Sequence, residues 1–137
     1  MKEGFTIIEE LHLPSDFNSL ADVEFLIDKV CSNLGVQEEA YGNVLIAVTE
    51  AVNNAIQHGN AFSSDLFVKV AVGDKSDEFC FTIKDGGKGF EFDALPDPTA
   101  PENMLKENGR GIFLMRNLAD DVVYEEPGNE VTIYFSK

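Results

Sequence analysis

The sequence predicts an α+β fold, a two-layer α/β sandwich in which a mixed sheet is covered on one face by three helices. Segments rich in β-branched residues and segments with helical apolar periodicity occur in the order β-α-α-β-β-loop-α-β-β. Two strand pairs flank short turns rich in glycine and polar residues, as hairpins do. The chain has 137 residues, 44% of them hydrophobic and 26% charged, which suits a single domain covering residues 1–137. A sheet of four or five strands is therefore expected.

The first strand and the first helix are expected near the N-terminus. Residues 4–13 carry the β-branched and apolar side chains of a strand, and Pro14-Ser15-Asp16 supplies a turn with a helix N-cap. Between Phe17 and Leu34 the apolar residues fall on one stripe of a helix. Gly35 is a natural stop for that helix.

The second helix is expected to begin at Val36-Gln37-Glu38-Glu39, because acidic residues suit the positive end of the helix dipole. It should run to His58-Gly59. An imidazole in the last turn suits the dipole, and Gly59 can adopt the left-handed conformation of a helix cap. These local reasons explain both residues without a catalytic role for His58.

The remaining elements are two hairpins separated by a long loop and a short helix. The strands of these hairpins are expected at residues 67–72, 78–83, 121–125 and 130–135. Residues 90–108 are rich in Gly and Pro and are interpreted as a lid, because such long loops in compact domains are usually functional or disordered. The short helix should follow at residues 109–119.

The net charge of −15 argues against a nucleic-acid partner, because phosphates would be repelled over most of the surface. Half of the Lys and Arg residues lie between Lys84 and Arg116, which is where a polyanionic ligand would bind, although chance clustering is the alternative. No apolar run could cross a bilayer and no secretory signal is visible, so we expect a cytoplasmic protein without membrane contact. Cys31 and Cys80 lack metal-binding spacing and are interpreted as reduced, buried side chains.

One face of the second helix carries polar residues that could take part in chemistry. Glu50 and Asn54 lie one turn apart on it, and small Ala47 beside them leaves room for a ligand. An amide oxygen is a good ligand for Mg²⁺, and a carboxylate one turn away can position or deprotonate a hydroxyl group. A solvent-exposed helix face is the alternative, although this face lacks the Lys and Arg residues of ordinary surface helices.

Two glycine motifs lie further along the chain. Asp85-Gly86-Gly87-Lys88-Gly89 follows a strand directly, so its backbone could approach a ligand closely while Asp85 accepts a hydrogen bond from an exocyclic amine. An ordinary turn would also explain this motif. Asn108-Gly109-Arg110-Gly111 opens the third helix, where bare N–H groups and the guanidinium of Arg110 form an anion site. Neither a Walker loop nor a dinucleotide-binding fingerprint is present.

Taken in order, these motifs resemble the N, G1 and G2 boxes of the GHKL ATPases, which have the Bergerat (histidine-kinase-like ATPase) fold. The matching residues are Glu50-x-x-x-Asn54 on a helix, Asp85-x-Gly87-x-Gly89 after a strand, and Gly109-x-Gly111 opening a helix after a lid. The stretches 49–59 and 109–122 are similar to those of the bacterial anti-sigma-factor serine kinases. The resemblance covers nearly the whole chain.

The resemblance implies roles for individual residues. Asn54 would ligate Mg²⁺, Asp85 would bind the adenine amino group of ATP, and Glu50 would be the base that orients the acceptor serine of a partner. The residues that would frame the nucleotide are Gly87, Gly89, Gly109, Arg110 and Gly111. The implied protein is a Mg-ATP-dependent serine protein kinase and anti-sigma regulatory factor that binds a sigma factor and phosphorylates a STAS-type anti-sigma antagonist. A homodimer is also implied.

Two other functions share the same ATP site. The chain could be an ATP-binding interaction module that sequesters a partner with little or no kinase activity. It could also be the catalytic fragment of a histidine kinase, but neither His12 nor His58 is expected on a dimerisation helix. The sequence departs from the resembled family where Asn129 and Glu130 replace the usual threonine near the adenine.

Overall fold

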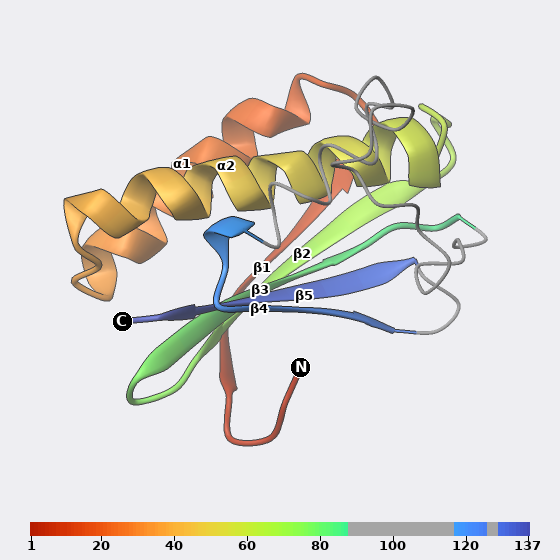
Figure 1. Cartoon of the computed structure of the whole chain (residues 1–137). Helices are drawn as coiled ribbons and strands as arrows, with labels where there is room; N and C mark the ends of the chain where they lie inside the picture. Colours follow the sequence, from red (N-terminus) through yellow and green to blue (C-terminus); the bar gives the residue numbers. More distant parts are fainter. Residues whose placement is uncertain (88–116, 126–128) are drawn as a thin grey trace, which may run out of the picture.

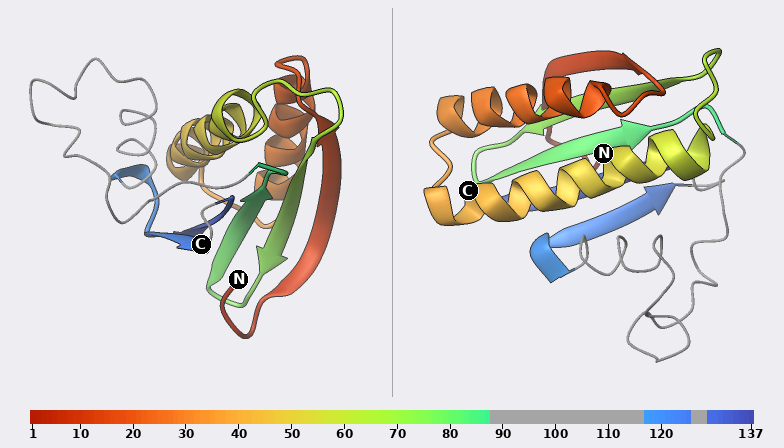
Figure 2. Two further views of the ribbon diagram at one scale, coloured as in Figure 1. Left: turned by 90° about the vertical axis from the view of Figure 1, so that its right-hand side faces the viewer. Right: turned by 90° about the horizontal axis from the view of Figure 1, so that it is seen from above.

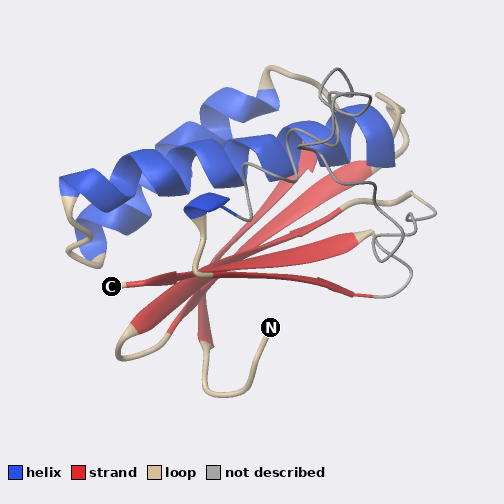
Figure 3. Cartoon of the chain, viewed as in Figure 1, coloured by secondary structure: helices blue, strands red, loops and turns tan. Residues whose placement is uncertain are grey.

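The computed structural model of the protein has two layers, in which α1 and α2 pack on one face of a five-stranded sheet (Figure 1). The same division into a helical layer and a sheet layer is seen in Figure 3. The structure describes residues 1–87, 117–125 and 129–137. Its elements are β1 (Thr6–Pro14), α1 (Ser19–Asn33), α2 (Glu38–Asn54), the π-helical turn η1 (Ala55–Gly59), β2 (Phe67–Asp74), β3 (Glu78–Lys84), β4 (Asp121–Glu125) and β5 (Glu130–Ser136). The predicted α+β class and two-layer arrangement are confirmed.

The strands lie in the order β1-β2-β3-β5-β4, and every neighbouring pair is antiparallel. The prediction of a mixed sheet is therefore wrong for the described strands. A single helix between two strands returns the chain to the end of the sheet where the first strand began, so the second strand runs parallel to the first. Two helices bring the chain to the end where the first strand stopped, so the next strand runs antiparallel, as β2 does to β1. β3 and β4 do run in the same direction, but β5 lies between them.

The two described helices lie next to each other across the sheet (Figure 2). Of the predicted third helix at 109–119, only the last residues are described, and residues 117–118 are helical. The predicted lid at 90–108 lies outside the described residues. No helix in the described ranges has the length and apolar character that crossing a bilayer requires.

Local contacts explain where α1 begins and ends. The carboxylate of Asp16 accepts the backbone N–H of Asn18 at 2.8 Å, and the carbonyl of Asp16 accepts that of Ser19 at 2.9 Å. The helix N-cap is Asn18, which makes no side-chain capping bond, so the prediction of a cap within residues 14–16 is wrong, and Asp16 instead organises the turn that leads into the helix. Gly35 follows the helix with a φ of +67°, a left-handed conformation that glycine adopts without strain.

The core lies between the helices and the sheet. Val48 and Ile56 from the helical layer meet Phe81 from β3, and all three side chains have 0% exposure. Removing these apolar surfaces from water supplies the main driving force that holds the two layers together. Cys31 and Cys80 are buried free thiols, as predicted, and burial raises the pKa of each to about 11.

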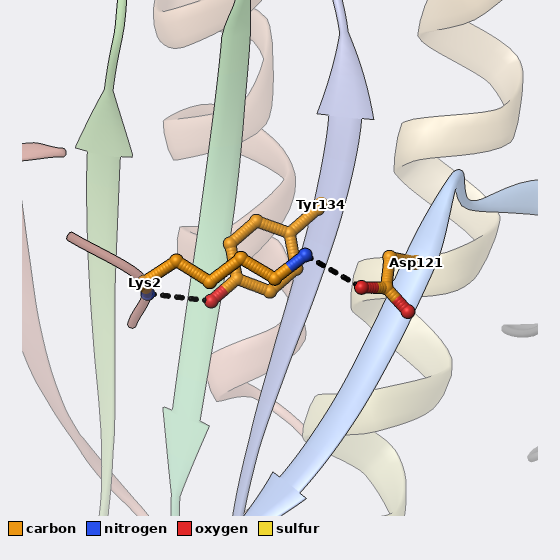
Figure 4. A network of polar contacts seen from close by, with 3 residues as sticks. All are labelled: Lys2, Asp121 and Tyr134. Carbon is orange, nitrogen blue, oxygen red and sulfur yellow. Dashed lines mark hydrogen bonds and ion pairs between the residues drawn. The ribbon is translucent and has the colours of Figure 1, made fainter. Parts of the chain in front are cut away.

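The N-terminal residues cross the face of the sheet that is turned away from the helices (Figure 1). The backbone N–H of Lys2 donates to the Tyr134 hydroxyl at 2.8 Å, and the Lys2 ammonium pairs with the Asp121 carboxylate at 2.6 Å (Figure 4). On the same face the hydroxyls of Thr82 and Thr132 share a buried hydrogen bond of 2.9 Å. This face therefore combines paired polar groups with apolar side chains such as Phe5, whose ring packs against Tyr134, whereas the helix-covered face is apolar.

Candidate functional site

The polar face of α2 carries the two side chains that the sequence assigned to chemistry. Glu50 and Asn54 are both partly buried and lie one helical turn apart. Among the described residues, neither side chain forms a hydrogen bond or an ion pair, so their oxygens are free to meet a ligand. Ala47 was expected to leave room for that ligand, but it is fully buried in the core at 0% exposure, and that prediction is wrong.

A π-helical turn begins directly after Asn54 and was not predicted. It covers Ala55–Gly59 and is closed by the backbone N–H of Asn60, which donates to the carbonyl of Ala55 at 2.8 Å. Single π turns inside helices often occur at functional sites, because the extra residue reorients the side chains around it.

Gly59 does not have the left-handed conformation that was predicted for it. The positive φ angles fall instead on Ala61 at 47° and Phe62 at 58°, where they are strained. A Cβ atom on Gly59 would lie 2.8 Å from Oδ1 of Asp85 and nearer still to Oδ2. Glycine is therefore required at this position because the Asp85 side chain packs directly against the helix backbone.

Asp85 follows β3 directly, as predicted, and its loop is held against the end of the helical run. Oδ1 of Asp85 accepts the backbone N–H of Gly87 at 2.8 Å. A Cβ atom on Gly87 would overlap the Gly59 carbonyl, so two glycine backbones meet here without space for side chains. Burial raises the pKa of Asp85, against the opposing effect of the Gly87 hydrogen bond. A half-buried carboxylate with a free oxygen can accept a hydrogen bond from an amine on a bound ligand.

Asn129 lies beside this loop at the start of β5. Its carbonyl accepts the backbone N–H of Asp85 at 2.9 Å, and its side-chain amide lies 3.4 Å from the Asp85 carbonyl and 3.5 Å from that of Gly87. The residue that replaces the usual threonine of the resembled family therefore helps to hold the Asp85 loop.

The structure describes four of the predicted site residues, and the others lie outside the described ranges. Asp85 and Gly87 meet the end of the helical run at Gly59, and Glu50 and Asn54 lie on the preceding turns of that run. Gly89, Gly109, Arg110 and Gly111 lie outside the described residues. Within the described ranges no group of three or more His, Cys, Asp or Glu residues could hold a metal ion. A metal at Asn54 would therefore need oxygen ligands from a bound molecule, as Mg²⁺ in nucleotide sites commonly does.

A two-layer α/β domain with a polar helix face, a carboxylate at a strand end and closely packed glycines has the features of a nucleotide-binding domain. The family model described as histidine kinase-like ATPase domain matches residues 13–135. The chain belongs to this family.

Proteins of known name show the same relationship. The chain is 30% identical over 144 residues to the serine-protein kinase RsbW of Staphylococcus aureus, covering 99% of this chain and 87% of the relative. It is 28% identical over 132 residues to the serine-protein kinase RsbW of Staphylococcus epidermidis, covering 90% and 83% respectively. The predicted resemblance to anti-sigma-factor kinases is thereby confirmed.

A solved structure shows the same fold. The crystal structure of the RsbU and RsbW domains of Rv1364c from Mycobacterium tuberculosis aligns with a TM-score of 0.63 and 16% sequence identity. The alignment covers 94% of this chain but only 32% of that longer chain. At this identity the likeness concerns the fold alone.

Proposed function

We propose that the protein is a Mg-ATP-dependent serine protein kinase and anti-sigma regulatory factor. It would bind a sigma factor and phosphorylate a STAS-type anti-sigma antagonist on serine. Family membership and the names of the relatives support this proposal. The observation that carries it is the position of Glu50 one turn before Asn54, on a helical run whose end packs against the Asp85 loop.

The proposed nucleotide site divides into a base end and a phosphate end. At the base end, Asp85 accepts the adenine amino group, while Gly59 and Gly87 allow the backbone to lie close. At the phosphate end, the Asn54 amide oxygen would ligate Mg²⁺, which when bound would neutralise phosphate charge. Gly89, Gly109, Arg110 and Gly111 would complete the phosphate end with backbone N–H groups and one guanidinium.

Glu50 would handle the acceptor. Its carboxylate accepts the proton of the partner's serine hydroxyl. The serine oxygen forms a bond to the γ-phosphorus of ATP, and the bond from the γ-phosphorus to the oxygen that bridges the β- and γ-phosphates breaks. The products are ADP and phosphoserine. Little covalent chemistry is required of the protein, so the positions of the two reacting oxygens decide the rate. The proposal includes a cytoplasmic location, a homodimer, and no direct contact with nucleic acid.

Phosphoryl transfer from labelled ATP to a purified STAS-type antagonist tests the assignment. Glu50→Ala should lower the transfer rate by about 100- to 10,000-fold while ATP affinity stays within about twofold. Glu39→Ala, an exposed carboxylate on the first turn of the same helix, is the matched control and should leave both unchanged. Undiminished transfer in Glu50→Ala would show that the assigned base is wrong. A wild-type protein that binds ATP but transfers no phosphate to any antagonist would instead be an interaction module that acts by sequestration.

A further inference from the structure

Asn60 is a buried polar residue to which the proposed chemistry gives no role. It is the first residue after the π turn and only 2% exposed. Its backbone is fully used, because its N–H donates to Ala55 and its carbonyl accepts the N–H of Ser63 at 2.9 Å. Burying a side-chain amide is costly unless both of its groups find partners.

The Asn60 amide finds both partners in segments that are distant in sequence. Its Nδ2 donates to the Ser15 hydroxyl oxygen at 2.8 Å, and its Oδ1 accepts the backbone N–H of Gly86 at 2.7 Å. The Ser15 hydroxyl in turn donates to the carbonyl of Leu66 at 2.6 Å. Ser15 can only accept from Asn60 because its own proton is already used, and the Gly86 N–H can only donate, so each partner by itself requires this orientation of the amide.

This orientation places a fixed acceptor under the loop that carries Asp85. Gly86 lies between Asp85, whose N–H is held by Asn129, and Gly87, whose N–H is held by the Asp85 carboxylate. Three consecutive backbone N–H groups of this loop are therefore hydrogen-bonded, and the middle one depends on the Asn60 side chain. Without that bond the loop keeps the hydrogen bonds of the Asp85 and Gly87 N–H groups but loses the hydrogen bond that joins it to the end of the helical run.

We propose that Asn60 is a positioning residue that sets the place of the Asp85 carboxylate and thereby the preference for a purine with a 6-amino group over one with a 6-oxo group. The inference rests on the proposed binding of ATP. A 6-amino group donates to Asp85, whereas a 6-oxo group presents an acceptor to it and is repelled. Displacing the carboxylate therefore weakens ATP binding and leaves ITP binding almost unchanged.

Calorimetric titration of the full chain with Mg-ATP and Mg-ITP tests the proposal. In Asn60→Ala we expect ATP affinity to fall about tenfold and ITP affinity to change less than about twofold, so that the ATP/ITP preference falls about tenfold. Ser15→Ala is the matched control, since it removes the other partner of the amide but leaves the bond to Gly86. It should lower the melting temperature and keep the preference within about twofold of wild type.

A purely structural role for Asn60 predicts a different result. Equal losses of ATP and ITP affinity in Asn60→Ala, or an equal loss of preference in Ser15→Ala, would overturn the assignment. If Asn60→Ala does not fold, Asn60→Ser, which keeps a polar group but is too short to reach Gly86, should show the same selective loss. A wild-type chain that binds neither nucleotide would overturn the proposed function itself, and that failure is recognised before any variant is measured.

Discussion

The two ends of the proposed site are built differently. At the Asp85 end, two glycine backbones touch, and Asn60 and Asn129 tie the loop to its neighbours. At the other end, Glu50 and Asn54 extend from an intact helix without a hydrogen bond to any described residue. Within the described residues, close packing and hydrogen bonds therefore fix the Asp85 end, whereas no such contact fixes the side chains of the helix-face end. Substitutions at the Asp85 end should therefore affect folding and binding together, and those on the helix face should affect binding or transfer alone.

The largest effect is expected from Gly59→Ala. The new methyl group would overlap the Asp85 side chain, and the loop would have to move away from the helix backbone. We expect Mg-ATP affinity to fall by at least about 100-fold, together with a lower melting temperature. Calorimetry and thermal unfolding measure the two effects. A variant that binds ATP normally would show that the contact between the helical run and the Asp85 loop does not shape the site.

The role of Gly59 also shows where prediction from sequence stopped. Strands, helices and the position of Asp85 were predicted because each depends on a short local pattern. The need for glycine at position 59 arises from the packing of a segment that is distant in sequence, so a local rule suggested a helix cap instead. The π turn and the buried amide of Asn60 likewise depend on hydrogen bonds that no periodicity reveals. The mixed sheet was a topological error, because the strand that follows β4 inserts next to β3.

The next largest effect is expected from Asn54→Ala on the helix face. Loss of a Mg²⁺ ligand should weaken Mg-ATP binding by about 10- to 100-fold, while binding measured in EDTA should not change. The melting temperature of the free protein should stay near that of wild type, since the Asn54 side chain bonds to no described residue. Asn43→Ala, an exposed amide on the same helix, is the matched control. An equal loss of affinity with and without Mg²⁺ would exclude Asn54 as a metal ligand.

Asp85→Asn should change stability and ATP binding in opposite directions. Burial raises the pKa of Asp85, so the folded state holds its proton more tightly than the unfolded state. The contribution of such a group to stability is complete below its unfolded pKa and is lost as the pH rises through the folded value. Asparagine does not ionise, so the variant does not lose stability as the pH rises. Its side-chain carbonyl oxygen can still accept the Gly87 N–H.

We therefore expect Asp85→Asn to melt above wild type by a few degrees at pH 7, and the gain should disappear below about pH 4. ATP affinity should fall about tenfold, because a charged acceptor for the adenine amine is lost. Thermal unfolding across pH without nucleotide, followed by calorimetry, measures both. Asp65→Asn, at an exposed position, should change neither quantity. A lower melting temperature for Asp85→Asn at pH 7 would contradict the burial argument.

The smallest effect is expected from Gly42→Ala, which separates close packing from helix propensity. Gly42 lies in α2 like the other helical positions, but a Cβ atom there would meet nothing within 4 Å. Alanine in an open helical position should stabilise the protein by roughly 0.5–1 kcal/mol and raise the melting temperature slightly, with ATP affinity unchanged. If Gly42→Ala raises the melting temperature and Gly59→Ala lowers it in the same unfolding experiment, the loss of stability at position 59 comes from the contact with Asp85. If both substitutions destabilise the protein, the helical run as a whole does not tolerate alanine. The effect of Gly59→Ala could then not be attributed to close packing at the Asp85 end of the site.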